Sequence, residues 1–578
     1  MTATGTMASI PVLSLITFMP SLGALFIIIF VKHQQAAGLK WAALVTSLAT
    51  FLLSLYLPLT FNVHTPAFQW VEKAIWIERF GIHYFLGVDG ISLLLVLLTT
   101  LVTVICVLAS WTEITIKLKP YLVLFLVVET GVLGVFMSLD LFLFYIFWEI
   151  VLIPMVFIIG VWGGVRRLYS AIKFFLFTFA GSLFMLLGIL ALCFYHGQLT
   201  GIYTFDATIL FENPPAANIQ RWIFLAFFLG FAVKIPMFPL HTWLPDAHTE
   251  APTAGSIFLA AVLLKLGTYG FVRFSLPLLP HASVFFAPLM LALSIIAILY
   301  GAYVTIAQKD MKKLVAYSSV SHMGFVMLGL FVFNPEGIKG GLLQMINHGI
   351  STGALFLLVG MIYERTHHRM IEDFSGLFRV VPVYGIFFLI VALSSMGMPV
   401  TNGFIGELYV LIGAYKAHWF FAIPVVIGVL LGTVYLMWMF QRVFLGALVI
   451  QGSNALKDLG RREISAMAPL LIIIFWIGLY PKPFLQTTDA SINNLVKMME
   501  ANLQKSTAPK KSGAGNTGPW LSEAPDAPIL FDEYRIGGQG DSRSGFQPQT
   551  ANRRLNVALA GHEPADYIFS DVTSDWKN

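Results

Sequence analysis

The sequence predicts an all-α polytopic membrane protein with about fourteen transmembrane helices. Composition is the first reason: 57% of the 578 residues are hydrophobic, only 11% are charged, and the mean hydropathy is +0.80. Soluble globular domains lie far from these values. The second reason is that apolar stretches of about 20 residues recur along roughly the first 490 positions. Each stretch is long enough to cross a hydrocarbon core of about 30 Å as a helix.

The predicted helices follow one another with short polar connections. Their approximate limits are 10–31, 41–60, 88–110, 121–138, 140–162, 174–195, 221–248, 254–275, 284–306, 314–333, 341–362, 381–416, 419–447 and 465–484. The first has no basic residue before it and is too long for the core of a signal peptide. We therefore expect it to be a retained membrane helix.

Basic residues are distributed unevenly between the alternating loops. One set of loops carries only a few, chiefly Lys73, Arg79, Lys339, Lys416 and Lys482. The other set carries Lys32, Lys40, Lys117, Lys119, Arg166, Arg167, Lys173, Lys309, Lys312, Lys313, Arg365, Arg369, Lys457, Arg461 and Arg462. By the positive-inside rule the richer set is cytoplasmic, which places both termini outside if the helix count is even. The net charge of +5 follows this sidedness and gives no support for nucleic-acid binding.

Two of the predicted helices contain residues that interrupt a helix. The seventh carries Pro236 and Pro239 in mid-span, and the twelfth carries Gly397, Pro399 and Gly403. Proline removes an intrahelical hydrogen bond and clashes with the preceding turn, so both helices should break and free backbone groups near the membrane interior. Broken membrane helices are typical of binding sites and ion paths.

The spacing of the two breaks indicates two inverted five-helix repeats. Pro399 lies 163 positions after Pro236, and the ninth helix begins about 163 positions after the fourth. Helices 4–8 and 9–13 then form the repeats, and an odd number of helices turns the second copy upside down. The predicted divisions are 1–120 (helices 1–3), 121–280 and 281–450 (the repeats), 451–499 (the last transmembrane helix) and 500–578 (a polar C-terminal extension).

The polar extension is rich in Gly, Ser, Pro, Asp and Asn, so we expect no further membrane-spanning helix there. We expect it on the non-cytoplasmic side. It is either disordered or laid against a neighbour by apolar anchors, Trp520 and residues 529–531.

Ionisable residues at interior depths are the main functional signal. A cation at the bilayer centre costs roughly 2.5–3.5 kcal/mol, so such residues usually face a protein interior or a water-filled cavity and take part in ion traffic. Lys234 and Lys265 each lie within a mostly apolar run, and Glu149 lies about 14 Å below the start of its helix at Asp140. The whole set comprises Glu149, Lys234, Lys265, His322, His348 and Glu407.

These residues suggest a proton path. We expect Glu149 and Lys234 to pair, because opposite charges favour each other's ionised forms while desolvation favours the neutral forms. Drawing Glu149 away would then leave Lys234 readier to release a proton. Lys265 can accept that proton through water, and the two histidines can relay it near neutral pH. Glu407 ends the series beside the second helix break.

Other readings of single residues stay open. His322 and His348 could instead be interhelical hydrogen-bond partners or, less favourably, axial haem ligands. His241 shares the helical face of Lys234 only if the proline break leaves the register intact, and it could be structural. The remaining candidates are Glu129 as a second-tier site, Asp246 with His248 as caps or crosslinks of the seventh helix, and Cys106 with Cys193 as buried thiols.

Four strings of the sequence resemble the antiporter-type membrane subunits of respiratory complex I. They are FYIFWEIVLIPM, AVKIPMFPLHTWLPDAHTEAPTAGSIFLAAVLLKLGTYG, KKLVAYSSVSHMGF and INHGISTGALFLLVGMIYERTHHR. The resemblance spans nearly all of residues 80–480. It is strongest to the M-type branch, because Glu407 stands where the L and N relatives carry lysine and because the long lateral helix of the L type is missing. The polar extension departs from the usual family pattern, which leaves its role open.

The resemblance implies fourteen core helices, proton translocation driven by NADH oxidation and quinone reduction in other subunits, and a bacterial inner membrane. It implies no cofactor or metal in this chain, with FMN, iron–sulfur clusters and quinone in partner subunits and the L and N subunits as neighbours. By motif match, the proton-transfer residues are Glu149, Lys234, Lys265 and Glu407.

Three alternatives remain at this stage. The main one is the D-type component of a multisubunit Na⁺/H⁺ (Mrp-type) antiporter, against which Glu407 argues. A hydrogenase- or formate-linked membrane arm is the second. The third is a scaffold whose buried charges only hold helices together, in which case Lys234→Ala and Glu149→Gln would disturb assembly and leave coupling intact.

Overall fold

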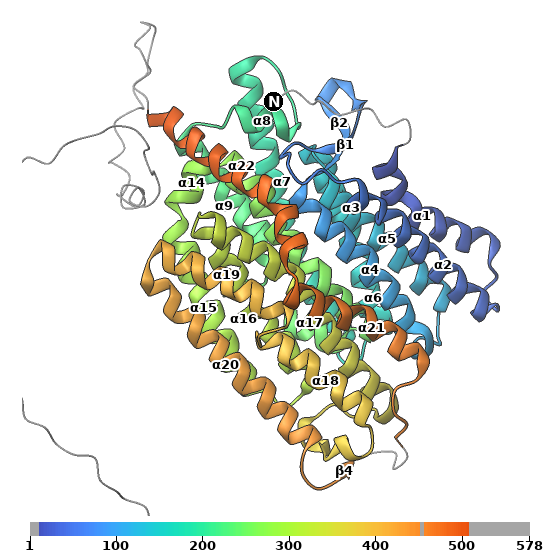
Figure 1. The fold of residues 1–578 in the computed structure, drawn as a ribbon. Coiled ribbons are helices and arrows are strands. Elements are labelled where there is room, and N and C mark those ends of the chain that lie inside the picture. Colours follow the sequence, from blue (N-terminus) through green and yellow to red (C-terminus); the bar gives the residue numbers. More distant parts are fainter. Residues whose placement is uncertain (1–10, 451–455, 508–578) are drawn as a thin grey trace, which may run out of the picture. The chain divides into compact units, whose positions relative to one another are not determined.

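A computed structural model describes residues 11–450 and 456–507 of the chain. Nearly all of the predicted polar extension, including Trp520 and residues 529–531, lies outside the described residues. Figure 1 shows a bundle of helices with the strands β1 and β2 at one end and β4 at the other.

The first part of the bundle contains seven helices before residue 201. They are α1 (Val12–Phe30), α2 (Ala36–Ser54), α3 (Tyr56–Thr60), α4 (Gly90–Glu113), α5 (Leu118–Met137), α6 (Leu141–Trp162) and α7 (Arg167–Thr200). Asp140 accepts hydrogen bonds from the backbone N–H groups of Phe142 and Leu143, so it caps α6 at the helix start that the sequence predicts. The cap fixes the depth of Glu149 along this helix.

The middle part contains shorter helical pieces. They are α8 (Ala207–Glu212), α9 (Ala217–Lys234), α10 (Trp243–Glu250), α11 (Thr253–Phe258), η2 (Leu259–Leu263), α12 (Leu264–Gly270), η3 (Phe271–Ser275), α13 (Leu276–Leu278) and α14 (Pro280–Phe285). The segments η2 and η3 are π-helical turns on either side of the short helix that carries Lys265. Such turns are rare and often occur at functional sites.

The last part returns to long helices. They are α15 (Ala287–Ile306), α16 (Met311–Phe331), α17 (Pro335–Thr366), α18 (Pro382–Ser395), α19 (Asn402–Ala417), α20 (Trp419–Phe444), α21 (Arg461–Leu479) and α22 (Lys482–Thr507). The minor elements here are η4 (Ile371–Asp373), β3 (Phe374–Ser375), η5 (Leu377–Arg379) and β4 (Val449–Ile450), with β3 and β4 antiparallel.

Twelve helical segments among the described residues are long and apolar enough to cross a membrane. The two remaining predicted helices are divided, which confirms both predicted interruptions. The chain leaves the helical conformation between Lys234 and Trp243, and again between Ser395 and Asn402. None of the four halves is by itself a candidate span.

The most deeply buried helices lie in the centre of the bundle. Every residue in the apolar window of Thr253–Leu278 is buried, and 94% of the window is buried in both α16 and α17. By contrast, only 28% of the window of Ala36–Thr60 is buried, so that helix presents most of its apolar surface outward. Lys265, His322 and His348 therefore lie on the helices that are most enclosed by the protein.

Among the elements that were not predicted from the sequence, a hairpin and a long helix are the largest. The strands β1 (Gln69–Ile77) and β2 (Ile82–Val88) form an antiparallel hairpin, joined through the short helix η1 (Glu78–Phe80) and Gly81 at φ 63°. The second element is α22. The predicted helix 465–484 is instead two helices, because α21 ends at Leu479 and α22 begins at Lys482 and runs past position 499.

The helix α22 packs against α4 and α17. Its Ser491 hydroxyl oxygen accepts a hydrogen bond from the backbone N–H of Gly90 at 3.2 Å, and Asp489 pairs with Lys339. The side-chain amide of Asn502 donates to the carbonyl of Phe211 at 3.3 Å. The helix α22 is not among the candidate membrane spans.

Candidate functional site

Lys265 is fully buried in α12, and its amine has two polar contacts. Nζ lies 2.5 Å from the carbonyl oxygen of Ala260 and 2.6 Å from Nδ1 of His348. Ala260 belongs to the π-helical turn η2, one wide turn before the lysine. When protonated, Lys265 donates to both acceptors, so the π-helical turn and α17 together hold its charge at this depth.

His348 continues this series toward Glu407. Its ring centroid lies 5.8 Å from that of His322 on α16. His322 Nδ1 is 3.7 Å from Glu407 Oε1, and the amide of Gln344 donates to the same oxygen at 3.3 Å. The structure thus brings together Lys265, His348, His322 and Glu407 in one continuous run across α12, α17, α16 and α19.

A small cavity, with room for about one water molecule, lies beside this run. It is lined by His322, Gln344, Asn347, His348, Ser351, Thr352, Ser394, Ser395 and Gly403. The side-chain atoms Asn347 Oδ1, His348 Nε2 and Ser395 Oγ are buried without a hydrogen-bond partner in the described part of the chain. Such a lining suits water, which links groups that are too far apart for direct proton transfer.

Lys234 and Glu149 lie at the first helix break. Lys234 is the last residue of α9 and is 2% exposed, and its Nζ has no hydrogen-bond partner among the described residues. Glu149 acts on it electrostatically, but no direct hydrogen bond joins them. The amine instead lies over the rings of Trp148 and Phe174, at 5.4 and 5.8 Å from their centroids. The predicted pair is therefore coupled at a distance in this structure.

His241 lies apart from this run. It belongs to the non-helical segment between α9 and α10, so the helical register with Lys234 is lost. Its ring stacks on Phe238 and meets Tyr300 edge-on, with centroids 5.8 and 5.2 Å away. Both are ring-packing contacts.

The other second-tier residues have different surroundings. Asp246 pairs with Lys173 at 2.7 Å, which confirms the predicted crosslink from α10, here to α7. Neither ring nitrogen of His248 has a hydrogen-bond partner among the described residues, and its ring stacks on Phe356 of α17 with centroids 4.7 Å apart. Glu129 is fully buried on α5.

A buried ion pair between Arg273 and Asp89 was missed in the sequence. Arg273 Nε also donates to the Tyr269 hydroxyl at 3.1 Å, and Asp89 caps α4. Burial alone would raise the pKa of Asp89, but the charge and hydrogen bonds of Arg273 hold the pKa below its usual value. In the sequence, Asp89 and Arg273 lie at the edges of two apolar runs. Charged residues are common at helix ends, so these positions did not indicate an ion pair.

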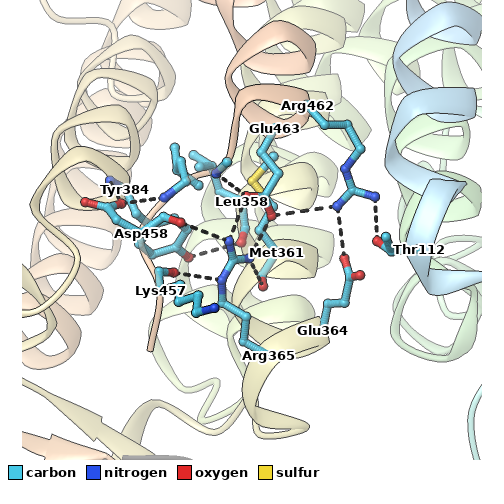
Figure 2. A network of polar contacts seen from close by, with 12 residues as sticks. Thr112, Leu358, Met361, Glu364, Arg365, Tyr384, Lys457, Asp458, Arg462 and Glu463 are labelled. Carbon is cyan, nitrogen blue, oxygen red and sulfur yellow. Dashed lines mark hydrogen bonds and ion pairs between the residues drawn. The ribbon is translucent and has the colours of Figure 1, made fainter. Parts of the chain in front are cut away.

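A second polar network ties the opposite end of α17 to its neighbours (Figure 2). Arg365 donates to both carboxylate oxygens of Glu463 on α21, at 2.7 Å each. Asp458 accepts from the backbone N–H groups of Val383 and Tyr384, which begin α18. The first half of the second broken helix is therefore fixed to α17 and α21.

These features define a class of protein: a polytopic membrane bundle with two interrupted helices and an enclosed row of lysine, histidine and glutamate, as in ion-translocating membrane subunits. Residues 138–432 match the family model described as NADH:quinone oxidoreductase/Mrp antiporter, transmembrane. The chain belongs to this family.

Three comparisons refine the relationship. NADH-quinone oxidoreductase subunit M of Rickettsia bellii is 42% identical over 496 residues, which cover 85% of this chain and 99% of that protein. A chain of respiratory complex I from Thermus thermophilus with bound NADH is 33% identical, with a TM-score of 0.77 over 84% of this chain and 99% of that one. The Mrp complex from Dietzia sp. DQ12-45-1b shares the fold, at 18% identity and a TM-score of 0.74 over 86% of this chain and 99% of that one. The predicted resemblance to the M-type branch is confirmed.

Proposed function

We propose that this chain is the proton-translocating, antiporter-like subunit of the membrane arm of an NADH:quinone oxidoreductase. In this role it acts as part of a translocating enzyme, and the redox steps take place in other subunits. FMN, iron–sulfur clusters and quinone belong to those partners, and the L and N subunits are its neighbours in the arm. Its location is a bacterial inner membrane.

The observation that carries the proposal is the run from Lys265 to Glu407. A buried lysine amine 2.6 Å from a histidine, followed by a second histidine and a carboxylate, offers alternating proton donors and acceptors inside the membrane. A scaffold needs charges that neutralise each other. Here the lysine contacts a carbonyl oxygen and an imidazole instead, which supports proton transfer over a purely structural role.

The proposed path has two halves. In the first, the charge of Glu149 controls whether Lys234 keeps its proton. In the second, a proton released from Lys234 reaches Lys265, passes to Nδ1 of His348 and then by way of His322 to Glu407. The small cavity beside the histidines supplies room for water in this second half.

The proposed topology follows from the same features. The two divided helices cross the membrane together with the twelve candidate spans, which gives fourteen crossings. Ten of these form two inverted repeats, the predicted helices 4–8 and 9–13. The polar extension then lies on the periplasmic side.

Two measurements test this function. A tagged copy of the chain, extracted from native membranes in mild detergent, should bring down an assembly with flavin and iron–sulfur clusters that oxidises NADH with quinone. An assembly without redox centres would favour an Mrp-type antiporter instead. Within the oxidoreductase, Glu149→Gln should suppress proton translocation with little loss of assembled complex, and normal translocation in that variant would refute the path.

A further inference from the structure

The amine of Lys234 is surrounded by aromatic rings. Its Nζ lies 5.4 Å from the ring centroid of Trp148 and 5.8 Å from that of Phe174, and it has no hydrogen-bond partner in the described part of the chain. Both distances are within the range of cation–π attraction, in which a ring face with partial negative charge stabilises a cation. Trp148 is 1% exposed and Phe174 is fully buried, so water does not screen either contact.

Packing holds the two rings in place. Trp148 packs between Phe144 and Phe231, with centroids 5.5 and 5.7 Å away. Phe174 packs on Trp243, at 5.2 Å. These rings come from α6, α7, α9 and α10. The packing of these helices therefore holds the rings in place around Lys234 whether or not its amine is charged.

The indole of Trp243 also fixes the backbone next to the lysine. Its Nε1 donates to the carbonyl of Val233 at 2.9 Å, one residue before Lys234 and at the point where α9 ends. This hydrogen bond therefore links Trp243, which packs against Phe174, to the end of α9 where the helix breaks.

Trp148 and Glu149 are consecutive residues of α6. Because an α-helix turns by about 100° per residue, their side chains leave the helix about 100° apart, at nearly the same depth along its axis. Lys234 thus faces two different partners from one turn of one helix. One partner is a ring face, and the other is a carboxylate that acts on the amine from a distance.

We propose that Trp148, with Phe174, forms an aromatic site that holds the protonated amine of Lys234 whenever it is away from Glu149. Lys234 alternates between the ring faces and the carboxylate. Over the rings it still carries its proton, but without the charge of Glu149 it releases that proton more readily to the next group. Trp148 is then a positioning residue for Lys234. This inference rests on the proposed function, because it assigns a step to the same lysine.

The test changes the ring electrostatics and leaves the ring shape almost intact. Tryptophan analogues with one, two and three fluorine atoms, placed at position 148 of the assembled complex, progressively weaken the negative face of the indole. We expect proton translocation per NADH oxidised, measured in proteoliposomes, to fall steadily along the series by about tenfold in total, equivalent to about 1.4 kcal/mol. Packing alone predicts no such trend, because the volume hardly changes.

A matched control uses the same analogues at Trp162. This indole donates to the carbonyl of Ile116 and contributes no cation–π contact among the described residues, so the series there should be flat. A flat series at position 148, while Lys234→Ala abolishes translocation, would overturn the aromatic site and leave the proposed function standing. Normal translocation in both Lys234→Ala and Glu149→Gln would instead overturn the proposed function.

Discussion

Gly397→Ala should interrupt the proton path at its far end. Gly397 lies in the turn between α18 and α19 with φ at 72°, a left-handed conformation that side chains with a Cβ rarely adopt. A Cβ built there would lie 2.2 Å from Oε2 of Glu407. The new methyl group would therefore displace the carboxylate at which the proposed proton path ends.

The size of the effect follows from the geometry. Real Cβ contacts essentially never fall below 3.0 Å, so the carboxylate has to move by at least 0.8 Å, the difference between 3.0 and 2.2 Å. Because Glu407 is the far end of a flexible side chain, it can move without unfolding the bundle. Its contact with His322 begins at 3.7 Å, so a shift away from the ring separates the last two groups of the path. A displacement of about 1 Å at a reacting group can cost about 100-fold in rate.

Gly201→Ala is the matched control. Gly201 has φ at 79°, and a Cβ there meets nothing within 4 Å. Both variants carry the backbone strain of a left-handed alanine, roughly 1–2 kcal/mol. Only Gly397→Ala displaces Glu407. NADH-driven proton uptake in inverted membrane vesicles should therefore fall by about 10- to 100-fold in Gly397→Ala and stay near normal in Gly201→Ala. Equal rates in the two variants, at equal amounts of assembled complex, would refute this reasoning.

Three further predictions test other parts of the structure. His348→Asn should lower proton translocation by about 100-fold, because it removes a proton acceptor of the proposed path. His241→Asn should have much less effect. The rate of vesicle acidification compares the two variants. Arg365→Leu should lower the stability by about 2 kcal/mol, because it leaves the buried carboxylate of Glu463 without its partner. Lys416→Met removes an exposed ion pair and should lower the stability by under about 1 kcal/mol. Thermal dissociation of the complex measures both losses, and equal shifts would contradict this ranking. Gly90→Val should loosen α22, because a Cβ there would lie 1.8 Å from a backbone oxygen of that helix. Proteolysis of the C-terminal region should become faster, and unchanged protection would argue against the contact.

Hydropathy predicted the long helices well because membrane burial acts on every residue of a span. Twelve helical segments of the described residues are candidate spans, and Pro236 and Pro399 located both breaks. The helix α22 was missed because it is not continuously apolar. Its buried residues Ile492, Leu495 and Met499 recur at helical spacing, so a search for periodicity would have found it.

The hairpin formed by β1 and β2 gave a weaker signal. Residues on a half-buried strand usually alternate between polar and apolar, but the burial of β1 does not alternate, and its large residues Ile75 and Trp76 are exposed. Without that alternation, the segment reads as an ordinary loop between two membrane helices.

The sequence predicted which residues form the candidate site, but it did not predict which groups they contact. A lysine or glutamate within an apolar run is conspicuous in any sequence. Burying its charge in a membrane costs free energy, so such residues usually have a function. The direct contact of Lys265 with His348, and the position of Lys234 over Trp148, depend on how helices far apart in the sequence pack. The expected pairing of Glu149 with Lys234 rested on charge alone, and charge does not reveal that the amine also lies over two aromatic rings.

The second helix break is held by more than its proline. Val400 is β-branched and has φ at 78°, a strained conformation that costs roughly 1–3 kcal/mol and persists only when its surroundings enforce it. On one side, α21 approaches so closely that a Cβ on Gly478 would lie 2.0 Å from the Val400 carbonyl oxygen. On the other side, Asn347 of α17 donates to the carbonyl of Asn402 at 2.7 Å. Neighbouring helices thus maintain the turn that begins α19, and this turn sets the distance from Glu407 to His322. The strained residue Val400 therefore lies in the turn that precedes the helix of Glu407, where the proposed path ends.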